Sequence, residues 1–175
     1  MMRFDVPGGR PGYYFHNGSI WSASVVENQT QVDGQRVVEL FHLQAVRNKF
    51  YARFVLTAPF QNAAVMESSD GQNWKVRAKT GDDLPVGPKL AFIHDFDANT
   101  NGELLISGTV EFSGIPILLS QKSAKLEYVH MLSQPITDST YLVRYDAIDI
   151  REDGSIIFSA YDASDRPVIY RLRKN

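Results

Sequence analysis

Three side chains that can bind a metal ion recur at a constant spacing. His42, His94 and Asp146 follow one another at intervals of 52 residues. Imidazole nitrogens and carboxylate oxygens are ligands that zinc accepts. If a structural unit repeats at this interval, equivalent positions of successive units can converge, and these residues form a candidate metal site. The alternative is that each makes local hydrogen bonds on a polar strand face, because such spacing is not a recognised ligand motif.

A second oxygen-rich pattern begins at Asp97. Asp97, Asn99 and Asn101 place oxygen-bearing side chains at alternate positions, as in the first half of a calcium-binding loop. The twelfth position of such a loop requires a bidentate glutamate, and here it is Gly108. A calcium ion at these three residues is one interpretation. The other is a hairpin turn at Asn101-Gly102 that the Asp97 carboxylate braces.

Several aromatic side chains could stack on sugar rings. The candidate ligand-binding residues are Tyr13, Tyr14, Trp21 and Tyr51. Aromatic side chains also dominate the packing of β-sheet cores. Core packing therefore stands as the alternative role for each of them.

The motifs of several enzyme classes are absent from the sequence. There is no Gly-x-Ser-x-Gly, no phosphate-binding loop and no dinucleotide fingerprint. The absence of cysteine excludes a cysteine nucleophile, a thiolate zinc site and a disulfide scaffold. Paired carboxylates of a glycosidase cannot be recognised from spacing, because their separation is set in three dimensions. We therefore assign no catalytic residue from the sequence.

Length and charge bound the remaining classes. The 175 residues suit one domain or at most two small ones, and 20 acidic against 18 basic residues leave a formal charge of −2. This balance gives no electrostatic footprint for nucleic acid or an anionic membrane. We find no run of about 20 apolar residues and no signal-peptide core. The expectation is a soluble chain without a signal peptide or membrane span, whose compartment the sequence does not reveal.

The elements that must position these side chains are strands. Runs of β-branched and aromatic residues cover 19–26, 49–56, 103–110 and 155–161. Dipeptides that suit tight turns separate such runs: Asn17-Gly18, Asp33-Gly34, Asp70-Gly71, Asn101-Gly102 and Asp153-Gly154. The pattern predicts a single, nearly all-β domain over residues 1–175.

Shifting the sequence by 52 residues aligns it with itself. The shift places Asp97 on Asp149, and it aligns the apolar residues Phe54, Ile106 and Phe158. We therefore expect repeats near 37–88, 89–140 and 141–175. They follow an irregular segment, 1–36, whose Met2–Val6 stretch is a candidate closing strand.

Each full repeat is expected to contain four strands. In the middle repeat these are 90–96, 103–110, 115–121 and 126–131. A four-stranded unit of this length is typical of a β-propeller blade, and a β-trefoil or another β-barrel is the alternative. Propellers need about 4–8 blades, so either the N-terminal segment completes a small ring or several chains combine. The partners expected are copies of the chain or other subunits of an assembly.

The segment Ser68-Ser69-Asp70-Gly71-Gln72-Asn73-Trp74 falls where the third and fourth strands of the first repeat should meet. It resembles the Asp-box, Ser-x-Asp-x-Gly-x-x-Trp, of the BNR or sialidase-like propeller families, with Gly71 one residue early. In those families the box stabilises a turn and performs no catalysis. We expect Ser68 and Asp70 to bond the turn backbone, Gly71 to adopt positive φ and Trp74 to pack on the sheet.

The function expected is a non-enzymatic, β-propeller-like binding or assembly module. Carbohydrate binding or virion attachment is its specific form. A sialidase-like glycoside hydrolase is the first alternative, although the resemblance then requires three arginines, a Tyr–Glu pair, an acidic Asp and six blades. A structural subunit of a phage tail or capsid is the second alternative.

Overall fold

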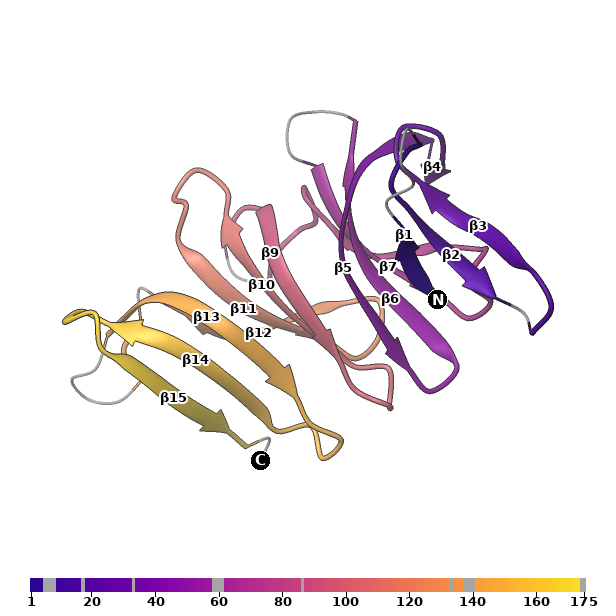
Figure 1. Cartoon of the computed structure of the whole chain (residues 1–175). Helices are drawn as coiled ribbons and strands as arrows, with labels where there is room; N and C mark the ends of the chain where they lie inside the picture. The colour runs from indigo at the N-terminus through magenta and orange to yellow at the C-terminus, as the bar shows by residue number, and fades with distance from the viewer. Residues whose placement is uncertain are drawn as a thin grey trace. The chain divides into compact units, whose positions relative to one another are not determined.

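The computed structural model describes residues 1–4, 9–16, 18–32, 34–57, 62–85, 87–132, 134–136 and 141–173, with no side chains for 2–4. The chain divides into two compact units, Met1–Lys79 and Thr80–Asn175. The described residues form antiparallel strands, turns and loops, so the protein is all-β (Figure 1). In this described part, no helix has the length and apolar character that crossing a membrane requires.

The strands follow one another as consecutive meanders. The first unit contains β1 (Met2–Phe4), β2 (Gly12–His16), β3 (Trp21–Val26), β4 (Gln31–Val32), β5 (Gln35–Val46), β6 (Lys49–Leu56), β7 (Asn62–Ser68) and β8 (Lys75–Lys79). The second contains β9 (Leu90–Ala98), β10 (Leu104–Val110), β11 (Pro116–Gln121), β12 (Leu126–Met131), β13 (Leu142–Ile150), β14 (Ile156–Asp162) and β15 (Pro167–Leu172). The strands expected in the middle repeat match β9–β12 within two residues at each end.

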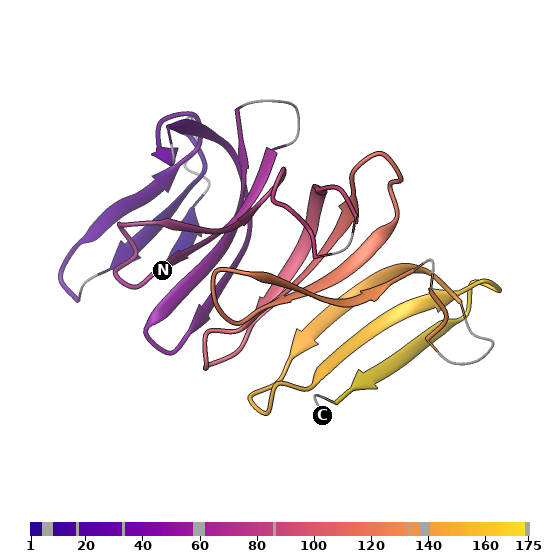
Figure 2. The ribbon, with the colours of Figure 1, turned by 180° about the vertical axis from the view of Figure 1, so that it is seen from behind.

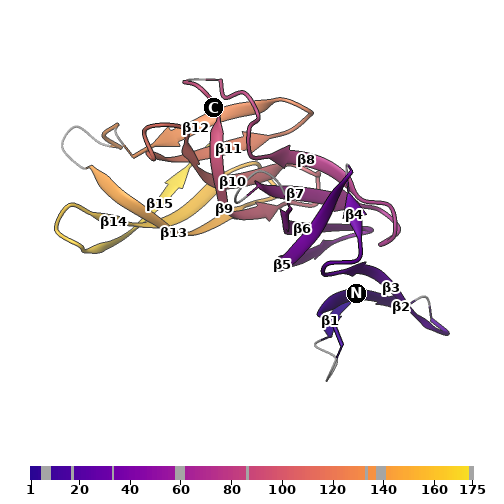
Figure 3. The same cartoon turned by 90° about the horizontal axis from the view of Figure 1, so that it is seen from above.

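The first unit consists of two sheets that stack through apolar faces. Strands β1-β2-β3 form one sheet and β4-β5-β6-β7-β8 the other, and Figure 3 shows them as separate layers. Tyr13 and Val25 of the first sheet share a buried cluster with Leu40, Phe54 and Met66 of the second. The ring centroids of Tyr13 and Phe54 lie 6.2 Å apart.

Residues 1–36 contain the strands β1–β4 and the start of β5, in place of the irregular segment expected from the sequence. The aromatic and β-branched residues of β2 and β3 pair across the turn at Gly18, which has a φ of 100°. Alternating apolar side chains give this hairpin one face to bury. Strand β1 pairs with β2, and the rest of the candidate closing strand, Asp5 and Val6, lies outside the described residues.

The second unit also consists of two stacked meanders. Strands β9–β12 form a four-stranded sheet and β13–β15 a three-stranded one (Figure 2). Leu105 and Leu118 of the first sheet pack in one buried cluster with Ile156, Phe158 and Ala160 of the second. Each sheet is too small to bury its own apolar face, so the stacking supplies the core.

The β9–β10 and β13–β14 ladders have the same register when residues 52 apart are compared. Asp97 pairs with Leu105, and Asp149 pairs with Ile157. The two irregularities along each ladder also fall at the same shifted positions. Two hairpins of one sequence pattern thus adopt the same pairing. The repeat boundaries and the single-domain organisation stay predictions.

The first repeat keeps this pattern less closely. Phe54 pairs with Leu40, whereas Ile106 pairs with Phe96, four positions further along in the shifted sequence. The hairpin loop accounts for three of these positions, because β5 and β6 join through the tight turn between Val46 and Lys49, and the irregularity between Leu40 and Leu43 adds the fourth. The loop between β9 and β10 is longer, so the same strand residue meets a different partner.

Replacing Phe158 with alanine tests the stacked core of the second unit. Phe158 is 1% exposed, and its ring lies 5.6 Å from the Tyr145 and Tyr170 rings. We expect Phe158→Ala to lower the free energy of unfolding by about 3–5 kcal/mol, because it leaves a cavity. Urea unfolding measures this change. Tyr141→Ala, at a residue 53% exposed, is the control and should change it by about 0.5 kcal/mol or less. A loss below about 1 kcal/mol for Phe158→Ala would contradict the packing described.

Candidate functional site

The three candidate zinc ligands are exposed and lie at irregular points of their strands. His94 lies at a β-bulge of the β9–β10 ladder, and Asp146 lies at the equivalent bulge of the β13–β14 ladder. His42 lies within a register irregularity of β5. Asp146 accepts a hydrogen bond of 3.2 Å from the Ser159 hydroxyl. Among the described residues, no group of three or more His, Asp or Glu side chains could hold a metal ion. Zinc at these residues stays a prediction.

The candidate calcium residues connect two hairpins of the second unit. The Asp97 carboxylate accepts a hydrogen bond of 2.7 Å from the Ile150 amide. The Asn99 side-chain oxygen accepts one of 3.0 Å from the Asn101 amide, and the Asn101 side chain donates to the Glu152 carbonyl at 2.9 Å. The Asp97 and Asn99 oxygens therefore already accept hydrogen bonds from protein N–H groups, and the Asn101 side-chain nitrogen ties the β9–β10 turn to the β13–β14 turn. Calcium here stays a prediction.

The four candidate aromatic residues are not gathered on one surface. Tyr13 is buried and its hydroxyl donates to a backbone carbonyl, and Tyr51 is fully buried. Tyr14 is half-buried, and Trp21 is 47% exposed with its ring 4.8 Å from the His16 ring. Packing accounts for Tyr13 and Tyr51, while Trp21 keeps surface for a ligand or partner.

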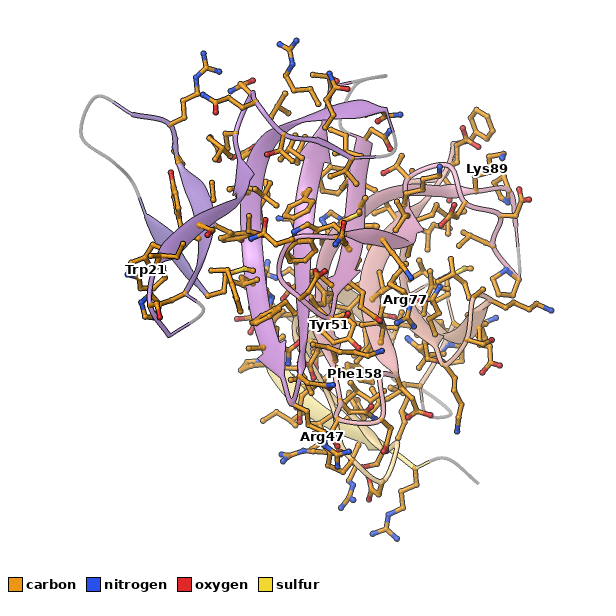
Figure 4. The ribbon with its side chains drawn as sticks, turned by 90° about the vertical axis from the view of Figure 1, so that its right-hand side faces the viewer. Trp21, Arg47, Tyr51, Arg77, Lys89 and Phe158 are labelled. Atoms are coloured by element: carbon orange, nitrogen blue, oxygen red, sulfur yellow. The ribbon has the colours of Figure 1, made fainter. Side chains whose placement is uncertain are left out.

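Tyr51 belongs to a charged cluster on β6, β7 and β8. It lies opposite Glu67 in the ladder, and the Glu67 carboxylate binds Lys49 at 2.7 Å and also Arg77. Figure 4 labels Tyr51 and Arg77. Burial and the Glu67 charge raise the pKa of Tyr51 to about 12. Burial favours neutral Glu67, but Lys49 and Arg77 outweigh it and hold that pKa below its usual value.

This cluster contains a Tyr–Glu pair, as the sialidase-like alternative requires. The Tyr51 hydroxyl is buried close to Glu67 and Arg77. The raised pKa keeps this phenol protonated near neutral pH. In this cluster Glu67 forms ion pairs with both Lys49 and Arg77.

The segment Ser68–Trp74 forms the turn between β7 and β8. One Asp70 carboxylate oxygen accepts hydrogen bonds from the Ser68 hydroxyl and from the amides of Gln72 and Asn73. Hydrogen bonds from the backbone and side chain of Asn73 are the main cause that holds the pKa of Asp70 well below its usual range. Gly71, with a φ of 72°, donates its amide to the Ser68 hydroxyl at 2.9 Å.

Trp74 fastens this turn to the neighbouring sheet of the first unit. Its indole N–H donates to the Ser24 hydroxyl at 3.0 Å, and its ring packs edge-on against Phe54 at 5.2 Å. The Ser24 hydroxyl in turn donates to the Gly71 carbonyl. The geometry gives these residues a structural role.

The second unit contains a pocket of about 350 Å³, which lies between strand ends and hairpin loops of its two sheets. This is the size of a site for a small molecule. We call it the Glu103 pocket. Its walls come from the loop before β10, the β11–β12 hairpin and the ends of β13, β14 and β15. The lining residues are Glu103, Ser120, Gln121, Lys122, Glu127, Tyr128, Val129, Ile150, Gly154, Ile156, Leu172 and Arg173.

Glu103 is the most firmly held charged group in this pocket. Its side chain is 9% exposed and forms an ion pair of 3.1 Å with Lys122. Its other carboxylate oxygen accepts a hydrogen bond of 3.0 Å from the Asn99 amide group. Asn99 is itself buried, and the same group also donates to the Arg151 carbonyl. A hydrogen-bonded chain across both sheets therefore fixes the carboxylate.

The rest of the lining combines polar and apolar surface. Glu127 and Tyr128 come from β12, and the Tyr128 hydroxyl donates to the Gln134 side chain. Burial raises the pKa of Tyr128, which keeps its hydroxyl protonated. Val129 and Leu172 add apolar surface. Two carboxylates face two cations in the lining, so the pocket has no formal net charge and suits a neutral polar ligand.

Sequence reasoning did not identify the residues of this pocket as a site. They span residues 103–173 and meet only because two sheets stack. One available signal was Glu103 itself, a charged residue at the end of an oxygen-rich turn. Its burial depends on Asn99 and Lys122, and neither contact follows from local periodicity.

No family model and no curated protein matches this chain. A search of solved structures finds similarity to the crystal structure of a "putative exo-beta-1,3-galactanase from Bifidobacterium bifidum s17", at 14% identity and a TM-score of 0.42. The match covers 74% of this chain and 47% of that one, so it spans about half of that protein's length. Function must therefore be argued from the site.

A buried histidine beside the pocket predicts a pH-dependent stability. His130 on β12 is 7% exposed, its Nδ1 lies 2.7 Å from the Tyr145 hydroxyl, and burial lowers its pKa. The unfolded chain, with a pKa near 6.5, binds a proton that the folded state resists. We expect the free energy of unfolding to fall as pH drops below about 6.5. Urea unfolding between pH 7.5 and 5 measures the slope. In His130→Gln the slope should flatten, and an unchanged slope would show that other groups cause it.

Proposed function

We propose that this chain is a non-enzymatic binding module whose Glu103 pocket takes a neutral carbohydrate. The observation that carries the proposal is the composition of the pocket. A rigid carboxylate, an amide and a hydroxyl stand beside an aromatic ring and aliphatic side chains within about 350 Å³.

This lining matches the chemistry of a sugar ring. Sugar hydroxyls both donate and accept hydrogen bonds, so they can pair with carboxylates such as Glu103 and with the ammonium of Lys122. The C–H faces of the ring are apolar and can lie against Val129, Leu172 or the ring of Tyr128. Arg173 is the one arginine among the lining residues, which favours a neutral sugar over a carboxylated one.

The architecture proposed is a propeller-like array related to the BNR or sialidase-like families. Three features support it: consecutive antiparallel meanders, the shared register of the β9–β10 and β13–β14 hairpins, and the Asp70-centred turn between β7 and β8. Virion attachment and a phage tail or capsid role stay predictions from the sequence, and the contacts described above do not bear on them.

A glycoside hydrolase is the second candidate, because Glu103 and Glu127 line the same pocket. Two carboxyl groups flanking one bond are the minimum for glycoside hydrolysis. Against this, Glu103 is already bound by Lys122 and Asn99, which leaves it poorly placed to exchange a proton.

The binding proposal is tested by a glycan array followed by titration calorimetry with a retained glycan. We expect Glu127→Gln to weaken binding about tenfold or more, because Glu127 is exposed at the pocket and loses a charged acceptor. The matched control is Glu111→Gln, beyond the opposite end of β10, which should leave affinity unchanged. An array without a retained glycan, or equal losses in both variants, would overturn the assignment.

The enzyme alternative is tested with fluorogenic glycosides. We expect no turnover above the rate without protein. If both Glu103→Gln and Glu127→Gln abolish turnover while Glu111→Gln retains it, the pocket is the active site of a hydrolase.

A further inference from the structure

The two units stack their sheets with the same polarity, by which we mean that the same face of the later sheet covers the earlier sheet. In the second unit, the Phe158 face of β13–β15 covers the face of β9–β12 that carries Leu105 and Leu118. In the first unit, the Phe54 face of β4–β8 covers the face of β1–β3 that carries Tyr13 and Val25. Phe54 and Phe158 are equivalent in the repeat, at twice the 52-residue spacing. In both units, therefore, the later sheet uses equivalent residues to cover the earlier sheet.

This polarity identifies the exposed face of β13–β15 as a receiving face. In the shared register, Ile157 stands where Leu105 stands in the preceding sheet, and Leu105 is fully buried. Ile169, which pairs with Ser159 on the same face, is 77% exposed. Ile157 and Arg171 line a shallow hollow of about 440 Å³ with Arg151, Glu152 and Asp153. This face has the position of a docking surface, because the described residues of the second unit leave Ile169 largely uncovered.

The exposed face of β1–β3 is the matching surface. Trp21 is 47% exposed and Ile20 61%, and Ala23 on the same strand is also exposed. The opposite face of this sheet is already covered by the Phe54 cluster. The exposed face of β1–β3 therefore corresponds to the Phe158 face of β13–β15, which covers the β9–β12 sheet.

We propose that the exposed face of β13–β15 binds the exposed face of β1–β3 in a second copy of this chain, head to tail. In this contact Ile157 and Ile169 meet Trp21, and the Arg171–Asp153 ion pair of 3.2 Å lies beside Ile157. Asp149 takes the place of Asp97, which binds a backbone amide of the sheet stacked upon it. Such a contact is heterologous, so it closes into a ring or grows into a filament. It rests on the repeat and the stacking, and it is independent of the ligand in the Glu103 pocket.

The absence of native cysteine allows a direct test by cross-linking. Ile169→Cys and Trp21→Cys are prepared as separate single variants and treated with a short bis-maleimide. Mixed together, they should give a two-chain product, and each variant alone should give little. The control is Phe112→Cys, at a turn residue 93% exposed, which should not cross-link with either. Self-linking of Ile169→Cys alone would replace the head-to-tail contact by a symmetric one, and an unlinked mixture would overturn the contact altogether.

Light scattering supplies the independent measurement. The purified chain at tens of micromolar should have at least twice the 19.7 kDa mass of one copy, and Ile169→Asp should return it to one copy. An unchanged circular dichroism spectrum and urea midpoint show that this variant still folds. Glu127→Gln, which tests the pocket, should leave the assembled mass unchanged, so failure of either proposal is distinguishable. A wild-type mass of one copy would overturn the assembly.

Discussion

The structure depends on one constraint: each small antiparallel sheet exposes an apolar face that only another sheet can cover. Sheets of three to five strands cannot wrap around their own core. Phe54 in the first unit and Phe158 in the second meet this constraint in the same way, by packing against an earlier meander. The repeat in the sequence thus becomes a repeat of packing.

Polar contacts decide how the sheets of the second unit align once they stack. Polar groups removed from water need hydrogen-bond partners, and half-buried Asp97 and buried Asn99 find theirs on the next hairpin, at Ile150 and Arg151. A slip between the sheets would leave these groups unpaired. The same contacts hold Glu103 in place, so the geometry of the pocket follows from the alignment of the two sheets.

Different residues serve the core and the candidate ligand site in this chain. Tyr13 and Tyr51 have the side chains most often associated with sugar binding, yet burial in the core takes both of them. The polar residues around Glu103 and Glu127 lie instead at strand ends, where the ladders stop and hairpin loops leave space between two sheets. A ligand site at this position can change with the loops while the stacked faces stay intact.

The sequence by itself determined the strands and turns of the middle repeat, and the register that β9–β10 shares with β13–β14. It also foresaw hydrogen bonds of Asp70 to its own turn. These features depend on neighbours along the chain, through alternation of apolar residues and through glycines such as Gly71 that accept positive φ. Only the tertiary structure decided that Tyr51 is buried, that residues 1–36 contain a sheet, and that Glu103 and Arg173 line one pocket. Burial and proximity between distant strands depend on which sheet faces stack. The periodicity of one strand shows which of its faces is apolar, but it does not show which sheet packs against that face.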